Sequence, residues 1–322
     1  MAGGGRGTMT LAQELDRYLS VRRSLEYDLA TAERVLRRFV QYADEQGVDH
    51  VTTDLFLRWQ GAFGNARRST WGARFIMVRL FSQWLHGMDA AHEVLPRGLV
   101  PYRYCRTHPY IFTLAQIVAI VEEAAQLPSI YGMRGLTCST LFGLIAVTGM
   151  RINEALSLDT GDVDLDNGRV HIRCGKLGKE RLLPVHDTAV DRLRAYVAQR
   201  DRLLGAASVP FFVKCDGSRL GDCGARYNFA HVCQRIGLRE PQTEGRHGRG
   251  PRIHDLRHSF AARTMIDWYR SGKDPAREMI KLTTWLGHAN PDHTYWYIEA
   301  VPELLDLASD RITDPHGREI CS

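Results

Sequence analysis

Residues 147–156 read Val-Thr-Gly-Met-Arg-Ile-Asn-Glu-Ala-Leu, which places an arginine at the boundary between two predicted helices. The first helix is expected to end at Gly149 and the second to begin near Ile152, so the guanidinium of Arg151 can face a pocket at their junction. Glu154 follows about one turn later and can hold the arginine in place. Because an isolated Arg–Glu pair on a helix is usually a surface salt bridge, this segment needs support from elsewhere in the chain.

A second segment, residues 254–260, reads His-Asp-Leu-Arg-His-Ser-Phe. His254 and Arg257 share one face of a predicted helix. An imidazole that can move protons therefore stands beside a guanidinium that can bind a phosphate through two hydrogen bonds. His258, taken alone, is more simply interpreted as a buried, hydrogen-bonded histidine.

A third segment, residues 286–290, reads Leu-Gly-His-Ala-Asn, and Tyr297 follows nine residues after its histidine. Gly287 is expected to end a helix, which leaves His288 at a place where a polar side chain can point into a cleft. The three segments together concentrate phosphate-binding and proton-transferring side chains at the ends of predicted elements.

The apolar pattern around these segments divides the chain into two domains. Residues 10–92 carry four stretches of helical spacing and predict an all-helical bundle, after a Gly-rich stretch over 1–9 that we expect to be disordered. Prolines and glycines interrupt the pattern over 93–111, as in a linker. Residues 112–309 form the second predicted domain, and 310–322 form a tail.

The second domain is predicted to be α+β, with one small antiparallel sheet among helices. Its first helix opens with Thr113 and Gln116 at capping-box spacing. Residues 169–173 and 181–185 flank a glycine-containing turn and indicate the two strands of a hairpin. Helices are expected over 135–148, 152–158, 187–202, 221–236, 254–270, 275–286, 291–299 and 301–309. The fold class of the whole chain is therefore mainly α with a small antiparallel β-sheet.

The composition is that of an ordinary soluble protein, with 44% hydrophobic and 25% charged residues among 322. The longest apolar run is too short to span a bilayer and no signal peptide is visible, so we expect a cytoplasmic protein with no membrane contact. A net charge of +5 is compatible with a polyanionic partner without requiring one. The seven cysteines form no CxxC pair, which predicts reduced, mostly buried thiols and no zinc site.

The three segments, in this order, resemble the motifs of the tyrosine recombinase, or phage integrase, family. The family's TGLRxxE pattern matches residues 148–154 with methionine in place of leucine, its HxLRH box matches 254–258, and its LGH box matches 286–288. A lysine-bearing hairpin motif of the family, GKxxKER, matches 175–181. The match covers about 113–300, and the N-terminal bundle resembles the family's DNA core-binding domain in size, helix content and position. Transposon-borne recombinases are the members that the whole chain most resembles.

The resemblance implies an enzyme and assigns its site residues. The six catalytic positions are Arg151, Lys176, His254, Arg257, His288 and Tyr297, with Glu154 and His258 in support. The positions expected to contact DNA are Lys179, Arg181, Arg252, Arg67 and Arg68. Tyr295 would point about 200° away from Tyr297 on a helix, and beside Trp296 it is interpreted as a packing residue.

The implied chemistry explains these residue types. Tyrosine can keep a phosphoryl group as an ester, but its phenol, with an ordinary pKa of about 10, needs a base, for which His254 is the candidate. Arg151, Arg257 and His288 would stabilise the charge on the pentavalent phosphate, and Lys176 would protonate the leaving 5′ oxygen. No metal and no other cofactor is expected, because the sequence shows neither a carboxylate cluster for Mg²⁺ nor a P-loop.

The expected partner is double-stranded DNA with specific recombination sites, bound by a dimer at each site and by a tetramer in the synapse, with accessory recombinases as further candidates. Two alternatives stay open: relaxation of DNA in the manner of a type IB topoisomerase, and a non-catalytic DNA-binding accessory role. The target sequence and the choice among integration, excision, transposition and resolution are not encoded in these motifs. The last predicted helix can pack on its own chain or on a neighbouring protomer.

Overall fold

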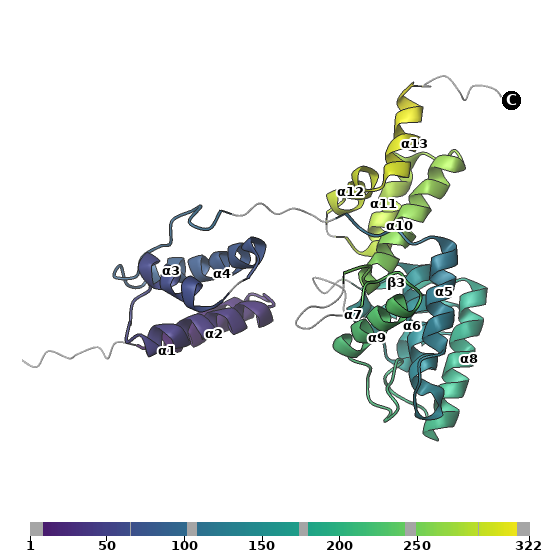
Figure 1. Ribbon diagram of the computed structural model, residues 1–322, viewed down its shortest axis with the longest axis horizontal. Coiled ribbons are helices and arrows are strands. Elements are labelled where there is room, and N and C mark those ends of the chain that lie inside the picture. Colours follow the sequence, from purple (N-terminus) through teal and green to yellow (C-terminus); the bar gives the residue numbers. More distant parts are fainter. Residues whose placement is uncertain are drawn as a thin grey trace, which may run out of the picture. The chain divides into compact units, whose positions relative to one another are not determined.

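The computed structural model describes residues 9–64, 66–101, 108–173, 180–241, 249–288 and 290–313. The chain divides into two compact units, Met1–Arg106 and Thr107–Ser322 (Figure 1). Among the described helices, none combines the length and the apolar character needed to cross a membrane.

The first unit consists of four helices, as the apolar spacing predicts. They are α1 (Leu11–Ser24), α2 (Ala30–Glu45), α3 (Thr53–Ala62) and α4 (Arg68–His86). Helix α1 begins with a capping box, in which Thr10 and Gln13 each accept a hydrogen bond from the other's backbone N–H. Thr52 caps α3 by accepting a hydrogen bond from the N–H of Leu55.

An aromatic cluster forms the centre of this unit. Trp59 is 1% exposed, and its ring centroid lies 5.2 Å from that of Phe39 and 5.4 Å from that of Trp71. Burying a large apolar side chain stabilises a fold by roughly 1.5–3 kcal/mol. The unit therefore has a hydrophobic core of its own.

The second unit is mostly helical. Its α-helices are α5 (Leu114–Ala125), α6 (Met133–Thr148), α7 (Ile152–Leu156), α8 (Asp187–Leu204), α9 (Asp222–Arg235), α10 (Ile253–Arg270), α11 (Pro275–Leu286), α12 (Asp292–Ala300) and α13 (Pro302–Thr313), with short 3-10 turns at Ile130–Gly132 and Thr160–Asp162. The predicted capping box of Thr113 and Gln116 starts α5. Helix α13 continues past residue 309, where the tail was expected to begin.

A three-stranded antiparallel sheet interrupts these helices, with the order β1 (Val163–Asp164), β2 (Arg169–Ile172) and β3 (Arg181–Pro184). The predicted hairpin is β2 and β3, in which Ile172 pairs with Arg181. Strand β1 is not predicted by the sequence, because two residues are too few to show an alternating pattern. The sheet places the start of β3 close to the site described below, through the side chain of Arg181.

Helix α6 is at the centre of the unit, where it packs against α5, α8 and α10. Leu141 and Phe142 are fully buried, and a helix covered on several sides shows no single apolar stripe. Helix α10 also packs against α11, α12 and α13 (Figure 1), and Leu304 of α13 is fully buried there. In the single chain, α13 therefore packs on its own unit.

Four cysteines fall in the described part of the chain, and all four are free thiols. Cys138 and Cys233 are buried as predicted, and burial raises the pKa of Cys138 to about 11. Cys215 and Cys223 are exposed, so the expectation of mostly buried thiols is wrong for half of the described set.

Candidate active site

The junction between α6 and α7 holds Arg151, as the sequence predicts. Gly149 ends α6 with a left-handed backbone (φ 65°), and Arg151 is the residue that precedes α7. A Cβ on Gly149 would lie 2.4 Å from Phe260 Cδ1, so this turn requires glycine for its conformation and for its space. The turn directs the chain so that Glu154 accepts a hydrogen bond of 2.8 Å from the backbone N–H of Arg151.

The Glu154 carboxylate joins two guanidinium groups. Its Oε1 accepts from Arg151 Nη1 at 2.7 Å and from Arg181 Nη1 at 3.1 Å, while its Oε2 accepts from Arg181 Nη2 at 2.7 Å. Burial acts to raise the pKa of Glu154, but the hydrogen bonds from Arg181 and Arg151 outweigh it and hold that pKa below its ordinary value. The carboxylate is therefore charged at neutral pH and compensates one of the two cations.

Arg257 lies on α10 and is 1% exposed. It donates to the carbonyl oxygen of Gly149 at 2.8 Å and to that of Leu286 at 2.7 Å, and Arg151 Nη2 donates to the next carbonyl, of Gly287, at 2.9 Å. These carbonyls belong to the C-terminal ends of α6 and α11, which lack helical partners and carry partial negative charge. Two helix ends thus hold the two arginines side by side.

Burial and the neighbouring Arg151 guanidinium lower the pKa of Arg257. An arginine begins from so high a pKa that it still keeps its charge at neutral pH. The pair is therefore a fixed concentration of positive charge, suited to a phosphate.

Tyr297 is 2% exposed, and its hydroxyl oxygen lies 2.7 Å from Nδ1 of His258. The ring of His258 also meets that of His254 edge-on, with centroids 4.6 Å apart. His258 is hydrogen-bonded, as interpreted from the sequence, but it is only partly buried. Its partner is the predicted nucleophile. The tyrosine hydroxyl contacts His258, whereas the motif suggests His254 as the base.

Burial, followed by the charges of Arg257 and Arg252, lowers the pKa of His254 to about 4. His254 is therefore a neutral imidazole at pH 7 in the free protein. It can accept a proton or a hydrogen bond without first losing a proton.

His288 follows Gly287 at the end of α11. Its Nδ1 lies 2.7 Å from Oγ1 of Thr294 on α12, and Thr294 is fully buried. This contact joins the end of α11 to the helix that carries Tyr297.

Tyr295 and Tyr297 differ sharply in exposure, at 45% and 2%. They lie on different faces of α12, as their spacing predicts. Tyr295 is largely open to solvent, so its interpretation as a packing residue is wrong. Of the two, Tyr297 is the one that reaches the histidines and arginines of the site.

The remaining predicted DNA contacts are distributed unevenly. Lys176 and Lys179 lie outside the described residues. Arg252 precedes α10 with its side chain 56% exposed and hydrogen-bonds Asp255. Arg181, in contrast, has a side chain only 11% exposed and engaged by Glu154 and by the carbonyl of Trp285, so the expectation that it contacts DNA does not fit its surroundings.

The first unit has a basic surface at the start of α4, where Arg67 and Arg68 are exposed. Nearby lies a cavity of about 260 Å³ lined by residues that include Arg34, Arg38 and Arg74. The guanidinium of Arg74 stands 4.3 Å from the centroid of the Phe63 ring, and that of Arg38 stands 5.4 Å from it. The sequence does not reveal this cavity, because its arginines come from separate helices.

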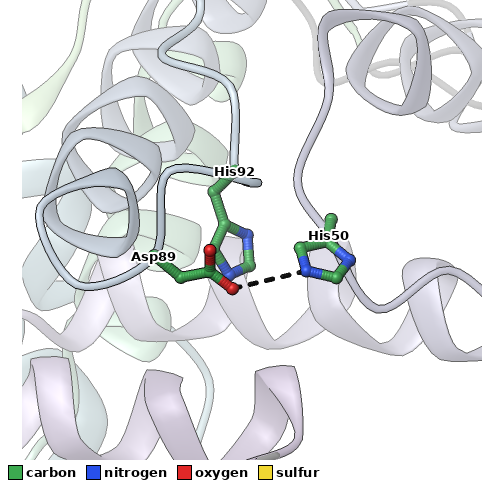
Figure 2. Close-up of side chains that lie close together, drawn as sticks. All are labelled: His50, Asp89 and His92. Atoms are coloured by element: carbon green, nitrogen blue, oxygen red, sulfur yellow. Dashed lines mark ion pairs between the residues drawn. The ribbon is translucent and has the colours of Figure 1, made fainter.

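One group of three potential metal ligands occurs in the described part of the chain, His50, Asp89 and His92 (Figure 2). Nδ1 of His92 accepts a hydrogen bond of 3.0 Å from the N–H of Val51, so a neutral His92 carries its proton on the other ring nitrogen and has no lone pair left for a metal. His50 lies between Asp49, at 2.6 Å, and Asp89, at 3.5 Å. These three side chains are better explained as polar contacts that connect the α2–α3 loop to the segment after α4 than as a metal site.

Comparison with known proteins identifies the family. The model of the phage integrase family matches residues 111–303. The putative integrase/recombinase y4rB of Sinorhizobium fredii is 34% identical over 308 residues, covering 94% of this chain and 97% of that protein. The tyrosine recombinase XerC of Herpetosiphon aurantiacus is 30% identical over 317 residues, covering 94% and 95%.

Two solved structures share the fold. The integrase of transposon Tn1549 in complex with transposon right end DNA matches with a TM-score of 0.63 at 16% identity, covering 95% of this chain and 100% of that one. The lambda integrase tetramer bound to a Holliday junction matches with a TM-score of 0.58 at 16% identity, covering 89% and 80%. With the family model matching more than half of its length, the chain belongs to the phage integrase family, the tyrosine recombinases that cut and rejoin DNA at specific sites.

Proposed function

We propose that this recombinase cuts DNA through a covalent bond to Tyr297, with Arg151 and Arg257 binding the scissile phosphate. The observation that carries the proposal is the buried cluster at the ends of α6 and α11, where both arginines are fixed by carbonyls and Tyr297 faces His258. A phosphate is a ligand that neighbouring guanidinium groups recognise well, because each can donate two hydrogen bonds to its oxygens.

In the proposed cleavage step, Tyr297 Oη attacks phosphorus and the bond from phosphorus to the 5′ oxygen breaks. The products are a 3′-phosphotyrosine and a free 5′-hydroxyl. Rejoining is the reverse reaction with a second DNA 5′-hydroxyl, so the phosphoester bond is conserved and no ATP is consumed. Arg151 and Arg257 stabilise the charge on the non-bridging oxygens, and losing such a donor costs on the order of 100–1,000-fold in rate.

The proton of Tyr297 needs an acceptor at the moment of attack. His258 Nδ1 is at hydrogen-bonding distance from the tyrosine oxygen, which supports His258 as that acceptor in the described arrangement. His254, neutral beside Arg257, is then assigned to the phosphate, together with His288. Lys176, which lies between β2 and β3 in the sequence, is proposed from its motif to protonate the leaving 5′ oxygen.

The exposed arginines of the first unit are proposed to contact DNA phosphates outside the cleavage site. This assignment is supported by the exposed positive charge of Arg67 and Arg68 at the start of α4, and by the arginines that line the cavity beside Phe63.

A dimer on each recombination site and a tetramer in the synapse are proposed by analogy with the lambda integrase dimer bound to a core site and the tetramer bound to a Holliday junction. Transposition is the proposed biological role, by analogy with the Tn1549 integrase. Accessory recombinases, suggested from the sequence, have no support in the described residues.

The first experiment finds the sites and tests the reaction. The protein is mixed with sheared genomic DNA of its source organism, denatured, and the DNA fragments that stay attached are sequenced. Two copies of a recovered site are then placed in one plasmid as direct repeats. We expect a smaller recombinant circle from the native chain and none from Tyr297→Phe.

Two other outcomes would contradict the proposal. Relaxed plasmid with no recombinant circle would indicate a topoisomerase reaction. Site binding with no attached DNA in any preparation would indicate a non-catalytic binder.

A further inference from the structure

Arg181, the first residue of β3, contacts two separate segments of the catalytic unit, helix α7 and the end of α11. Its Nη1 and Nη2 form a fork on the two oxygens of Glu154, at 3.1 and 2.7 Å. Its Nε donates to the carbonyl oxygen of Trp285, near the end of α11, at 2.9 Å. A planar guanidinium held at three nitrogens has little freedom to turn toward DNA.

The two hydrogen bonds from Arg181 to Glu154 also affect Arg151, because Arg151 binds the same carboxylate. Glu154 has only two oxygens, with a side chain 3% exposed, and each accepts one bond from Arg181 and one from Arg151. Arg181 therefore fixes the plane of the carboxylate that orients Arg151. Without Arg181, each oxygen of a buried carboxylate would keep a single one of these hydrogen bonds, and the carboxylate could rotate.

Gly287 shows how closely these groups are packed. It ends α11 with φ of 63°, and a Cβ there would lie 2.9 Å from Arg181 Nη1 and 3.5 Å from Arg151 Nη1. The next residue is His288. Arg181 thus lies against the backbone that leads into His288, and it begins the strand that follows the lysine-bearing hairpin.

We infer that Arg181 is a positioning residue for DNA cleavage, which fixes Arg151 through Glu154 and ties β3 to the end of α11. This inference rests on the proposed function, because it concerns the site that Tyr297 serves. It assigns Arg181 a role different from the DNA contact that its motif suggests.

The test separates cleavage from binding in Arg181→Met, which keeps an unbranched apolar stem but removes the guanidinium. The probe is a nicked duplex carrying a site recovered with the native chain. Binding is measured by gel shift, and the rate of covalent adduct formation is measured with all DNA bound. Misplaced catalytic groups typically cost on the order of 10–100-fold in rate, and we expect a loss of this size with little change in binding.

Arg173→Met is the matched control. Arg173 follows β2 on the same hairpin, its side chain is 50% exposed, and it pairs with Asp162 outside the cluster. The control removes the same charge from the same hairpin, and we expect the native cleavage rate. A native rate in Arg181→Met with weaker binding would identify Arg181 as an ordinary DNA contact and overturn the inference.

A double variant tests whether Arg181 acts through Glu154. We expect Glu154→Gln to slow cleavage, and the double change to be no slower than the slower single change, because both break one network. Multiplied losses would overturn the inference. If Arg181→Met fails to fold, Arg181→Lys is used instead, because lysine keeps the positive charge but cannot form the two hydrogen bonds to Glu154. A native cleavage rate in Arg181→Lys would also overturn the inference.

Adduct formation by the native chain distinguishes failure of the proposed function from failure of the inference about Arg181. If it forms no adduct, the proposed function falls. If it forms the adduct and the Arg181 variants cleave at its rate, the inference alone falls.

Discussion

At the scale of single residues, the proposed chemistry depends on Tyr297 and two histidines. His258 touches the tyrosine hydroxyl, while burial and Arg257 hold the pKa of His254 at about 4. A general base works only when unprotonated, so the rate it supports falls as the pH drops through its pKa. With its pKa at about 4, His254 stays unprotonated from pH 8 to pH 5, so a fall in the cleavage rate over that range would not come from His254.

We predict that His258→Gln slows adduct formation by on the order of 100-fold or more, the usual contribution of a positioned base. Because a pKa of about 4 leaves His254 neutral over this range, His254→Gln should leave the pH dependence of the rate between pH 5 and pH 9 unchanged, even where it lowers the rate. Rates measured under single-turnover conditions between pH 5 and pH 9 decide the matter, and a decline toward acid pH lost only in His254→Gln would return the base to His254.

The choice between these histidines marks the limit of what single residues reveal in the sequence. The motifs placed Arg151, Arg257, His288 and Tyr297 on elements that the structure brings to one cluster. They could not show which histidine meets Tyr297, since that depends on how α10 packs against α12. The burial of Arg181 could not be predicted from the sequence either, because its partners Glu154 and Trp285 are 27 and 104 residues away along the chain.

At the scale of elements, the site is built from the ends of helices. The last carbonyls of α6 and α11 bind Arg151 and Arg257, and a left-handed glycine ends each helix. These helix ends were predictable, because glycine after an apolar helical stretch commonly stops a helix. Strand β1 was not predictable, because its two residues are defined as a strand only by their pairing with β2.

Gly149→Ala tests the dependence on such a helix end. Left-handed backbone costs an alanine roughly 1–2 kcal/mol, and the new Cβ would overlap Phe260. Overpacking adds about 1–3 kcal/mol, so we predict a loss of roughly 2–5 kcal/mol in the free energy of unfolding of the catalytic unit.

Gly205→Ala provides the control for that change. Gly205 ends α8 with φ of 72°, and among the described residues no neighbouring atom lies within 4 Å of the position that an alanine Cβ would take. The change should cost only the backbone contribution of roughly 1–2 kcal/mol. Equal losses for both glycines in urea unfolding would show that the contact with Phe260 is unimportant.

At the scale of the whole molecule, the proposed function assigns the two units different tasks. The first has its own aromatic core and exposed arginines, and the second holds all the described residues that we place at the cleavage site. The division into two units was visible in the sequence from the lapse of apolar periodicity between them. The order of motifs along the second unit becomes a single cluster only after α6, α7, α10, α11 and α12 have packed.

The central claim is that Tyr297 becomes joined to DNA, and the most direct test is to find the tyrosine that carries the nucleotide. The adduct is trapped on a nicked duplex, digested with nuclease and trypsin, and the modified peptide is fragmented in a mass spectrometer. We predict the nucleotide on Tyr297, an undiminished adduct in Tyr295→Phe, and none in Tyr297→Phe, which loses one oxygen and little volume. A nucleotide on Tyr295, or on any other residue, would contradict the account.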